Sequence, residues 1–171
     1  IRVRTHLLKY HVDVVNVLIC HIRLPEELMS ITHSYNLSNH HLCLELTEGL
    51  VMKQPEKVIP MMQALRHLGF KISLDDFGMG YSSLSRLKKL PISSLKIDRS
   101  FIQGLPRDRG DCAIVRTILD LGRHMNLKVI AEGVETDAQL VFLRQFGCTL
   151  IQGFILSRPK QLTDLMVYLP A

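Results

Sequence analysis

Residues 71–83, which read KISLDDFGMGYSS, decide the fold of this chain. Alternation of apolar and polar residues predicts a strand over 71–76 that ends at two adjacent acids, Asp75 and Asp76. The two glycines that follow allow a sharp backbone bend, and the two serines after them suit a helix cap. The stretch therefore predicts a strand that runs into a loop carrying negative charge.

The acidic pair at the end of this strand needs a physical explanation. Two neighbouring carboxylates repel each other and shift each other's pKa values unless a cation lies between them. Carboxylate oxygens are also the ligands that Mg²⁺ and similar hard cations prefer. A solvated turn in which Asp75 or Asp76 caps the next helix is an equally weighted alternative, because Asp is common in turns. This stretch alone does not choose between them.

Composition narrows the class of protein. With 171 residues and 47% apolar composition, we expect one domain with a sizeable core. No apolar run approaches the roughly 20 residues of a membrane span, and no signal-peptide pattern is present, so we expect a cytoplasmic domain.

The formal charge of +5 favours an anionic partner. Lysines and arginines are dispersed and aromatic residues are few, which argues against a nucleic acid polymer as partner. The four cysteines lack the spacing of a zinc site or a disulfide framework, so we expect reduced thiols.

Strand and helix patterns alternate along the chain. Apolar runs predict strands over 12–19, 41–47, 71–76, 94–98, 128–131 and 149–154, with helices between them and a last helix over 162–169. Asp111 is the expected cap of one helix, and Thr136 with Gln139 forms an expected capping box. This order predicts six parallel strands with right-handed helical crossovers. An open doubly wound sheet and a (β/α) barrel both fit.

Polar residues near the carboxyl ends of the strands favour the barrel. In an open sheet reactive groups gather at one switch point, whereas in a barrel all strand ends converge on one mouth. Each of the six expected strands carries a polar residue there: Asn16, Glu45, Asp75 with Asp76, Lys96, Glu132 and Gln152. A barrel of this type needs eight strands. The predicted fold class is therefore α/β, an incomplete TIM-type (β/α) barrel.

Five ordered motifs identify a family. They are ELTE (45–48), DDFGMGYSS (75–83), LKIDRSF (95–101), AEGVET (131–136), and QGF (152–154) with SRP (157–159). Together they closely resemble the EAL-domain cyclic-di-GMP phosphodiesterases of bacteria. The resemblance implies a modified TIM barrel that hydrolyses cyclic-di-GMP to linear pGpG with two Mg²⁺ or Mn²⁺ ions.

The resemblance also implies a role for each matched residue. Lys96 is similar to the lysine that orients or deprotonates the attacking water, and Glu48 to the residue that steadies the loop after Asp76. The remaining positions are similar to metal ligands (Asn16, Glu45, Asp75, Asp76 and Glu132) and to substrate-binding residues (Gln152 and Glu135). Two divalent cations can stabilise both the attacking and the departing oxygen of an in-line displacement. Beside them the pKa of Lys96 should be lowered, which suits a base.

Ordinary structural roles compete with these assignments one by one. Glu45 could be half-exposed, Lys96 could pair with Asp98, and Glu132 could cap a turn at Gly133. Their joint occurrence at successive strand ends favours the metal site. The run Asp76 to Gly78 imitates the magnesium motif of kinases, but no kinase catalytic loop or glycine-rich strand accompanies it.

One departure from the family pattern matters for activity. The family is named for a Glu-Ala-Leu motif whose glutamate binds metal and whose neighbouring arginine grips substrate phosphate, and no such tripeptide occurs in this chain. We therefore expect residues 1–171 to form a single EAL-type domain that is truncated at its N-terminal side and lacks the first two strands of the EAL fold.

Two functions follow as alternatives. The chain is most of a phosphodiesterase domain, or it is a degenerate member that acts as a non-catalytic nucleotide-binding or protein-interaction module. The expected partners are cyclic-di-GMP and a sensory region upstream in the same parent protein, which could anchor it to a membrane. A homodimer is a further option.

Overall fold

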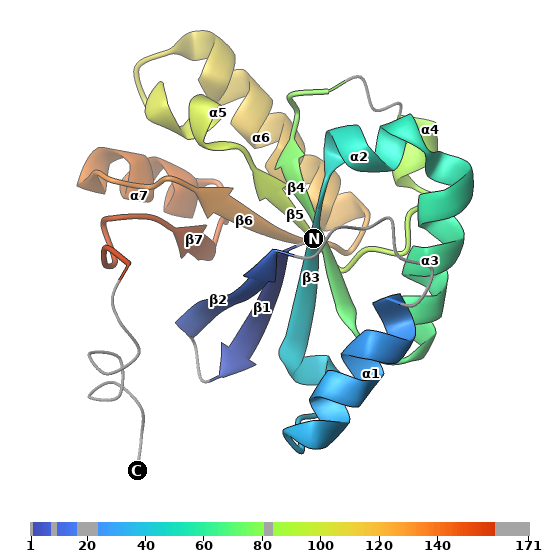
Figure 1. The fold of residues 1–171 in the computed structure, drawn as a ribbon. Coiled ribbons are helices and arrows are strands. Elements are labelled where there is room, and N and C mark those ends of the chain that lie inside the picture. Colours follow the sequence, from blue (N-terminus) through green and yellow to red (C-terminus); the bar gives the residue numbers. More distant parts are fainter. Residues whose placement is uncertain (1, 8–9, 17–23, 81–83, 160–171) are drawn as a thin grey trace.

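The computed structural model describes the backbone of residues 2–7 and 10–16, and residues 24–80 and 84–159 in full. Figure 1 shows how helices and strands alternate along this part of the chain. The strands are β1 (Arg2–Leu7), β2 (Tyr10–Asn16), β3 (Leu42–Thr47), β4 (Lys71–Phe77), β5 (Ser94–Ile97), β6 (Lys128–Glu132) and β7 (Leu150–Gln152). The helices are α1 (Leu24–Ser34), η1 (Asn39–His41, a 3-10 turn), α2 (Glu48–Lys53), α3 (Pro55–His67), α4 (Leu84–Leu87), α5 (Arg99–Gln103), α6 (Arg109–His124) and α7 (Asp137–Gln145).

One sheet contains all the strands of the described residues, in the order β2-β1-β3-β4-β5-β6-β7. Neighbours from β3 to β7 pair in parallel, and helices connect them. In Figure 1 these strands fan out at the centre, with α1 to α4 on the right and α5 to α7 at the upper left. This is an α/β, TIM-barrel-like arrangement that is incomplete in the described residues, as the sequence predicted.

The expectation that the first strand is parallel is wrong. Residues 12–16 belong to β2, which pairs antiparallel with β1, and β1 in turn pairs antiparallel with β3. Only two residues separate β1 from β2, and so short a connection joins strands as an antiparallel hairpin. Alternation of Val3, Thr5 and Leu7 with basic residues was the sequence signal for β1. The rest of the predicted strand, 17–19, lies outside the described residues.

Both faces of the parallel strands are buried, and their large apolar side chains form the core on one of them. Leu44, Leu46, Ile72, Leu74 and Leu95 are all at most 1% exposed. The strand register places these five side chains on one face, and Cys43, Glu45, Ser73, Asp75, Ser94 and Lys96 share the other. The face opposite the core thus carries most of the buried polar residues of these strands.

Helix caps fix where two of the outer helices begin. Thr136 and Gln139 form the predicted capping box at the start of α7, with each side chain bonded to the backbone of the other. The predicted cap at Asp111 is wrong, because Asp108 caps α6 and its Oδ1 accepts from the Asp111 backbone N–H at 2.9 Å. Asp111 lies in the first turn instead, where its charge favours the helix dipole.

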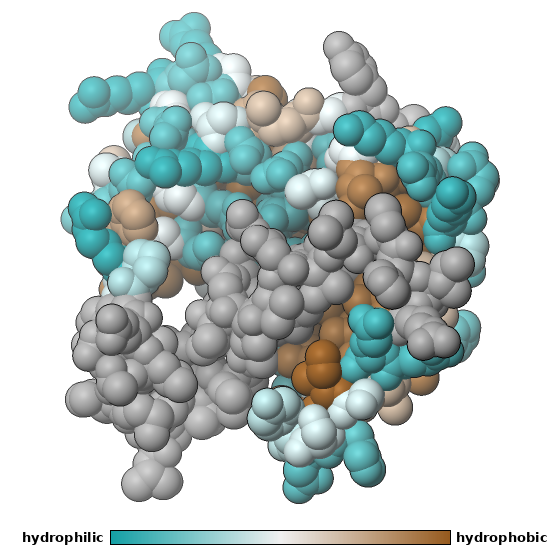
Figure 2. Space-filling view, in the orientation of Figure 1, coloured by the Kyte–Doolittle hydropathy of each residue, from teal (hydrophilic) through white to brown (hydrophobic). Residues whose placement is uncertain are grey.

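Hydrophilic side chains cover much of the outer rim where Figure 2 shows described residues, and apolar surface is seen in smaller areas between them. Among the described residues no helix is both long and apolar enough to span a bilayer. The three described cysteines, Cys43, Cys112 and Cys148, are buried and form no disulfide among the described residues, which agrees with the expected reduced thiols. Cys20 and the predicted helix over 162–169 lie outside the described residues.

Candidate functional site

The strand register brings the predicted site residues to one edge of the sheet. Thr47, which follows the ELTE acid Glu45 by two residues, is opposite Asp75 in the parallel pairing of β3 with β4. At the other end of the sheet Glu132 is opposite Gln152, where β6 and β7 both end. Because parallel strands have their carboxyl ends at the same edge, side chains far apart in sequence meet there.

Lys96 is the centre of this edge. Its side chain is 0% exposed, and its Nζ lies 3.0 Å from Glu45 Oε2 and 3.1 Å from Asp75 Oδ1. Nζ also forms an ion pair with Glu132 Oε1. Four strands, β3 to β6, therefore each contribute one charged side chain to a single buried cluster. Glu45 is 5% exposed and Asp98 instead caps α5, so the ordinary roles considered for Glu45 and Lys96 are wrong.

The carboxylates keep the buried amine charged. Burial disfavours an ammonium and by itself lowers the pKa of Lys96, but the charges of Glu132, Glu45 and Asp75 outweigh it and raise the pKa above the ordinary 10.5. The sequence-based expectation of a lowered Lys96 pKa depended on the charge of bound cations. The three carboxylates of the protein act in the opposite direction and raise this pKa.

The cluster fits a divalent cation in charge and in donor type. Counting only the described residues, three carboxylates around one ammonium leave an excess of two negative charges in a region that little water reaches. A buried excess of negative charge is costly unless another cation compensates it. The donors are all carboxylate oxygens, which suit Mg²⁺ and Mn²⁺. Within the described residues the acids converge on the ammonium, and no three acidic, histidine or cysteine side chains are arranged around a common point as a metal cage.

Three more predicted ligand or substrate residues lie at the same edge. Asp76 follows Asp75 with a left-handed backbone (φ 54°), an unusual conformation for a residue other than glycine. Gln152 is the last residue of β7. Asn16 ends β2, and backbone pairing places it opposite Arg2, which is itself opposite Glu45. The side chain of Asn16 lies outside the described part of the structure.

Glu48 contacts the loop to which the resemblance assigns it. This residue begins α2 and is 2% exposed. Its Oε2 accepts from the backbone N–H of Gly78 at 3.1 Å and of Gly80 at 3.3 Å. A Cβ at position 80 would lie 2.8 Å from Glu48 Oε1, so the loop approaches the carboxylate as closely as glycine allows. One acid thus holds the loop that follows Asp75 and Asp76.

Glu135 is partly exposed and has a partner that was not predicted from the sequence. Its Oε1 lies 2.8 Å from Nη2 of Arg99, the first residue of α5. The pair spans the loops after β5 and β6 at the mouth of the sheet. Arg99 and Glu135 both belong to quoted motifs, LKIDRSF and AEGVET, and that co-occurrence was the available signal.

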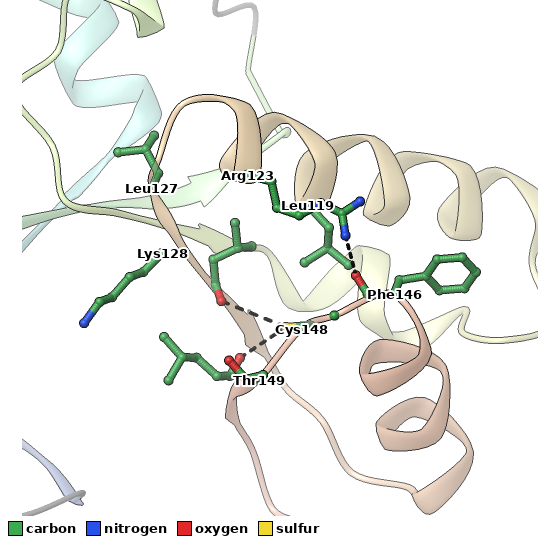
Figure 3. Close-up of a pocket in the computed structure, with 10 residues that line it drawn as sticks. Leu119, Arg123, Leu127, Lys128, Phe146, Cys148 and Thr149 are labelled. Atoms are coloured by element: carbon green, nitrogen blue, oxygen red, sulfur yellow. Dashed lines mark hydrogen bonds between the residues drawn. The ribbon is translucent and has the colours of Figure 1, made fainter.

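A separate cavity of about 380 Å³ lies at the opposite end of the sheet. Figure 3 shows it between the end of α6 and the starts of β6 and β7, where the Arg123 guanidinium donates to the Phe146 carbonyl at 3.4 Å. Burial raises the pKa of the Cys148 thiol in its wall. None of the predicted site residues lines this cavity.

Comparisons with known proteins agree with the motifs and the fold. The family model described as "EAL domain" matches residues 4–159. The chain is 46% identical over 146 residues to the bifunctional diguanylate cyclase/cyclic di-GMP phosphodiesterase MucR of Pseudomonas aeruginosa, covering 85% of this chain and 21% of MucR. The chain thus spans about a fifth of the length of this curated relative.

Solved structures give the same result. The PaMucR phosphodiesterase in complex with c-di-GMP superposes with a TM-score of 0.82 at 46% identity, over 85% of this chain and 59% of that chain. BlrP1 of Klebsiella pneumoniae, in a manganese/cy-diGMP complex, superposes with a TM-score of 0.77 at 32% identity, over 81% of this chain and 35% of that one. Fold, ordered motifs and family match coincide along nearly the whole described chain, and we conclude that the chain belongs to the EAL domain family.

Proposed function

We propose that this chain is the core of a cyclic-di-GMP phosphodiesterase domain that hydrolyses cyclic-di-GMP to linear pGpG. The observation that carries the proposal is the convergence of Glu45, Asp75 and Glu132 on the buried Lys96 ammonium. Its support is chemical: a buried cluster with a net charge of −2 and only oxygen donors suits divalent cations and, through them, a phosphodiester substrate.

The proposed metal ligands are Glu45, Asp75, Asp76 and Glu132, with Asn16 as a further ligand. Two Mg²⁺ or Mn²⁺ ions held there would supply electrophilic stabilisation for in-line displacement at phosphorus. Manganese in a complex of a 32% identical relative supports a divalent ion of this kind.

The proposed role of Lys96 is electrostatic. Its ammonium holds the three carboxylates in one place, each within ion-pair distance, so that the acids are already gathered at the edge where a cation would bind. The amine also lies where it could orient the attacking water or accept its proton once cation charge lowers its pKa.

Further residues of the mouth are proposed to position the substrate. Glu48 fixes the loop after Asp76 through two backbone amides. Gln152 ends the strand next to Glu132, and Glu135 lies on the rim with Arg99. We assign Gln152 and Glu135 to substrate binding on this placement.

The activity of these 171 residues alone is proposed to be low. The Glu-Ala-Leu tripeptide, which in the family supplies a metal-binding glutamate and a nearby substrate-gripping arginine, does not occur in the chain. Loss of one ligand and of a positioning group weakens both metal binding and substrate orientation. We further propose that residues 1–171 are one domain of a longer signalling protein, because the chain spans only a fifth of its relative MucR.

The test compares the chain with a chimera that carries in front of it the preceding part of the PaMucR phosphodiesterase, of which this chain covers 59%. Both are incubated with cyclic-di-GMP and Mn²⁺, and pGpG is quantified by chromatography. We expect pGpG from the chimera, loss of that product in its Glu45→Gln variant, and turnover about 100-fold slower from the chain alone. A folded chimera that binds Mn²⁺ but leaves cyclic-di-GMP intact would refute the enzymatic proposal.

A non-catalytic nucleotide-binding module is the second candidate, favoured by the same missing tripeptide. It predicts that the chain retains cyclic-di-GMP in equilibrium dialysis with Mn²⁺ and forms no pGpG. Any pGpG formed by the chain itself would reject it.

A further inference from the structure

We propose that Arg99 is a positioning residue that holds the loop after β6, and through it the Glu132 carboxylate, at the buried Lys96 cluster. The inference rests on the proposed function, because it concerns the geometry of the same site. Arg99 itself is not expected to contact metal or substrate.

Two ion pairs of identical spacing join β5 and its helix to the end of β6. Lys96 pairs with Glu132, and Arg99, three residues later, pairs with Glu135, three residues after Glu132. The inner pair is buried at its lysine, whereas the outer pair is on the rim, with side chains 53% and 38% exposed. An ion pair this exposed contributes little to stability on its own. The role we infer for the Arg99–Glu135 pair is to fix the direction in which the loop leaves β6.

The aliphatic stem of Arg99 adds a second contact with the same loop. It passes over Gly133, the residue directly after Glu132, so closely that a Cβ there would overlap Arg99 Cγ and lie 2.9 Å from both Cβ and Cδ of Arg99. Gly133 has φ +71°, a conformation that favours glycine. Stem and guanidinium thus hold the loop at two points, on either side of Val134.

The loop held by Arg99 also carries β7. The Val134 backbone N–H donates to the Gln152 carbonyl at 3.1 Å, and the Ile155 N–H donates back to the Val134 carbonyl at 3.1 Å. A Cβ at Gly153 would overlap the backbone O and N of Val134, so the two loops are in close backbone contact. A shift of the loop after β6 would therefore move Glu132 and Gln152 together.

α5 itself is well anchored, which makes Arg99 an effective support. Asp98 caps the helix by accepting from the Ser100 N–H at 2.8 Å. At its other end, the Gln139 side chain donates to the buried Ile102 carbonyl at 3.1 Å. The loop after β6 is thus held against an element whose own position is fixed.

The experiment compares Arg99→Met, which keeps an apolar stem but removes the guanidinium, with Arg99→Lys and with Arg107→Met, an exposed arginine after α5 as the matched control. Mn²⁺ affinity is measured by isothermal titration, and hydrogen exchange is followed in the peptide containing residues 133–136. We expect Arg99→Met to weaken Mn²⁺ binding about threefold to tenfold and to speed exchange at Val134. Arg99→Lys should recover part of both, with little change in thermal midpoint in any variant.

Glu135→Gln should reproduce the effect of Arg99→Met, and the double variant should be no worse than either single one. Equal Mn²⁺ affinity and equal exchange in Arg99→Met and Arg107→Met would overturn the inference. If neither the unaltered chain nor the chimera binds Mn²⁺, the proposed function fails, and the exchange measurement alone decides the positioning role: faster exchange in Arg99→Met supports it and unchanged exchange rejects it.

Discussion

Replacing Lys96 by Met is the most direct perturbation of the candidate site. Methionine fills a similar volume and keeps the strand apolar, but it removes the only positive charge shown among Glu45, Asp75 and Glu132 in the described residues. The net charge of the cluster would change from −2 to −3 with no change in burial. Stability and metal binding should then respond in opposite directions.

The size of the effect follows from the burial of the pairs. Removing one partner of a buried ion pair costs about 3–5 kcal/mol, because the other charge is left uncompensated. Lys96 is 0% exposed and pairs with three acids, two of them with side chains at most 7% exposed, so the upper part of that range is expected. Against a typical total stability of about 5–15 kcal/mol, this loss is large.

Urea unfolding with EDTA and with Mn²⁺ measures both effects. In EDTA, Lys96→Met should lose about 3–5 kcal/mol relative to the parent chain, whereas Lys128→Met, an exposed lysine on β6, should change little. Mn²⁺ should stabilise Lys96→Met more than the parent, because the cation compensates charge that the amine no longer does. If Lys96→Met in EDTA is as stable as Lys128→Met, the argument that the amine compensates buried charge is wrong.

Three further predictions test separate contacts. Asp108→Ala should cost about 1 kcal/mol of unfolding free energy in urea and Asp111→Ala clearly less, because only the former caps α6; equal losses would contradict this assignment. Glu48→Gln should lower the free energy of unfolding by about 1–3 kcal/mol and speed hydrogen exchange at the Gly80 amide. The reason is that a neutral amide is a weaker acceptor for the two backbone N–H groups. Unchanged exchange would show that Glu48 does not hold this loop. Cys148, whose pKa burial raises above 9.0, should stay protonated and resist alkylation at pH 8 until urea unfolds the chain, as peptide mass mapping would show; rapid modification of the native protein would refute it.

The carboxyl ends of the parallel strands could be predicted from sequence for a simple reason. Each strand is a short apolar run in which a charged residue has no ordinary place, so Glu45, Lys96 and Glu132 stood out without any knowledge of their partners. Parallel topology then requires such ends to lie at one edge. The structure places these three residues in contact although they are distant in the chain.

The contacts that depend on side-chain conformation could not be predicted from the sequence. The α5 and α2 helices are too short for a periodic signal, so the anchoring of Arg99 and the position of Glu48 were not predictable from pattern. The sign of the pKa shift at Lys96 was likewise unpredictable, because burial and three carboxylates act in opposite directions. Only the short distances between Lys96 Nζ and the carboxylate oxygens explain why the carboxylates outweigh burial and raise the pKa.

A lysine at the centre of the acids also explains how the fold tolerates its own site. Leu95 and Ile97 on either side are fully buried on the other face of β5, so the strand is held by apolar packing regardless of the cluster. Replacing a buried ionic cluster by apolar residues is often neutral or stabilising, so stability alone gives no reason for this arrangement. The ammonium instead limits the repulsion between three carboxylates, and the charges of the cluster that belong to described residues still sum to −2. That remaining negative charge is what a pair of divalent cations, together with an anionic phosphodiester, would balance.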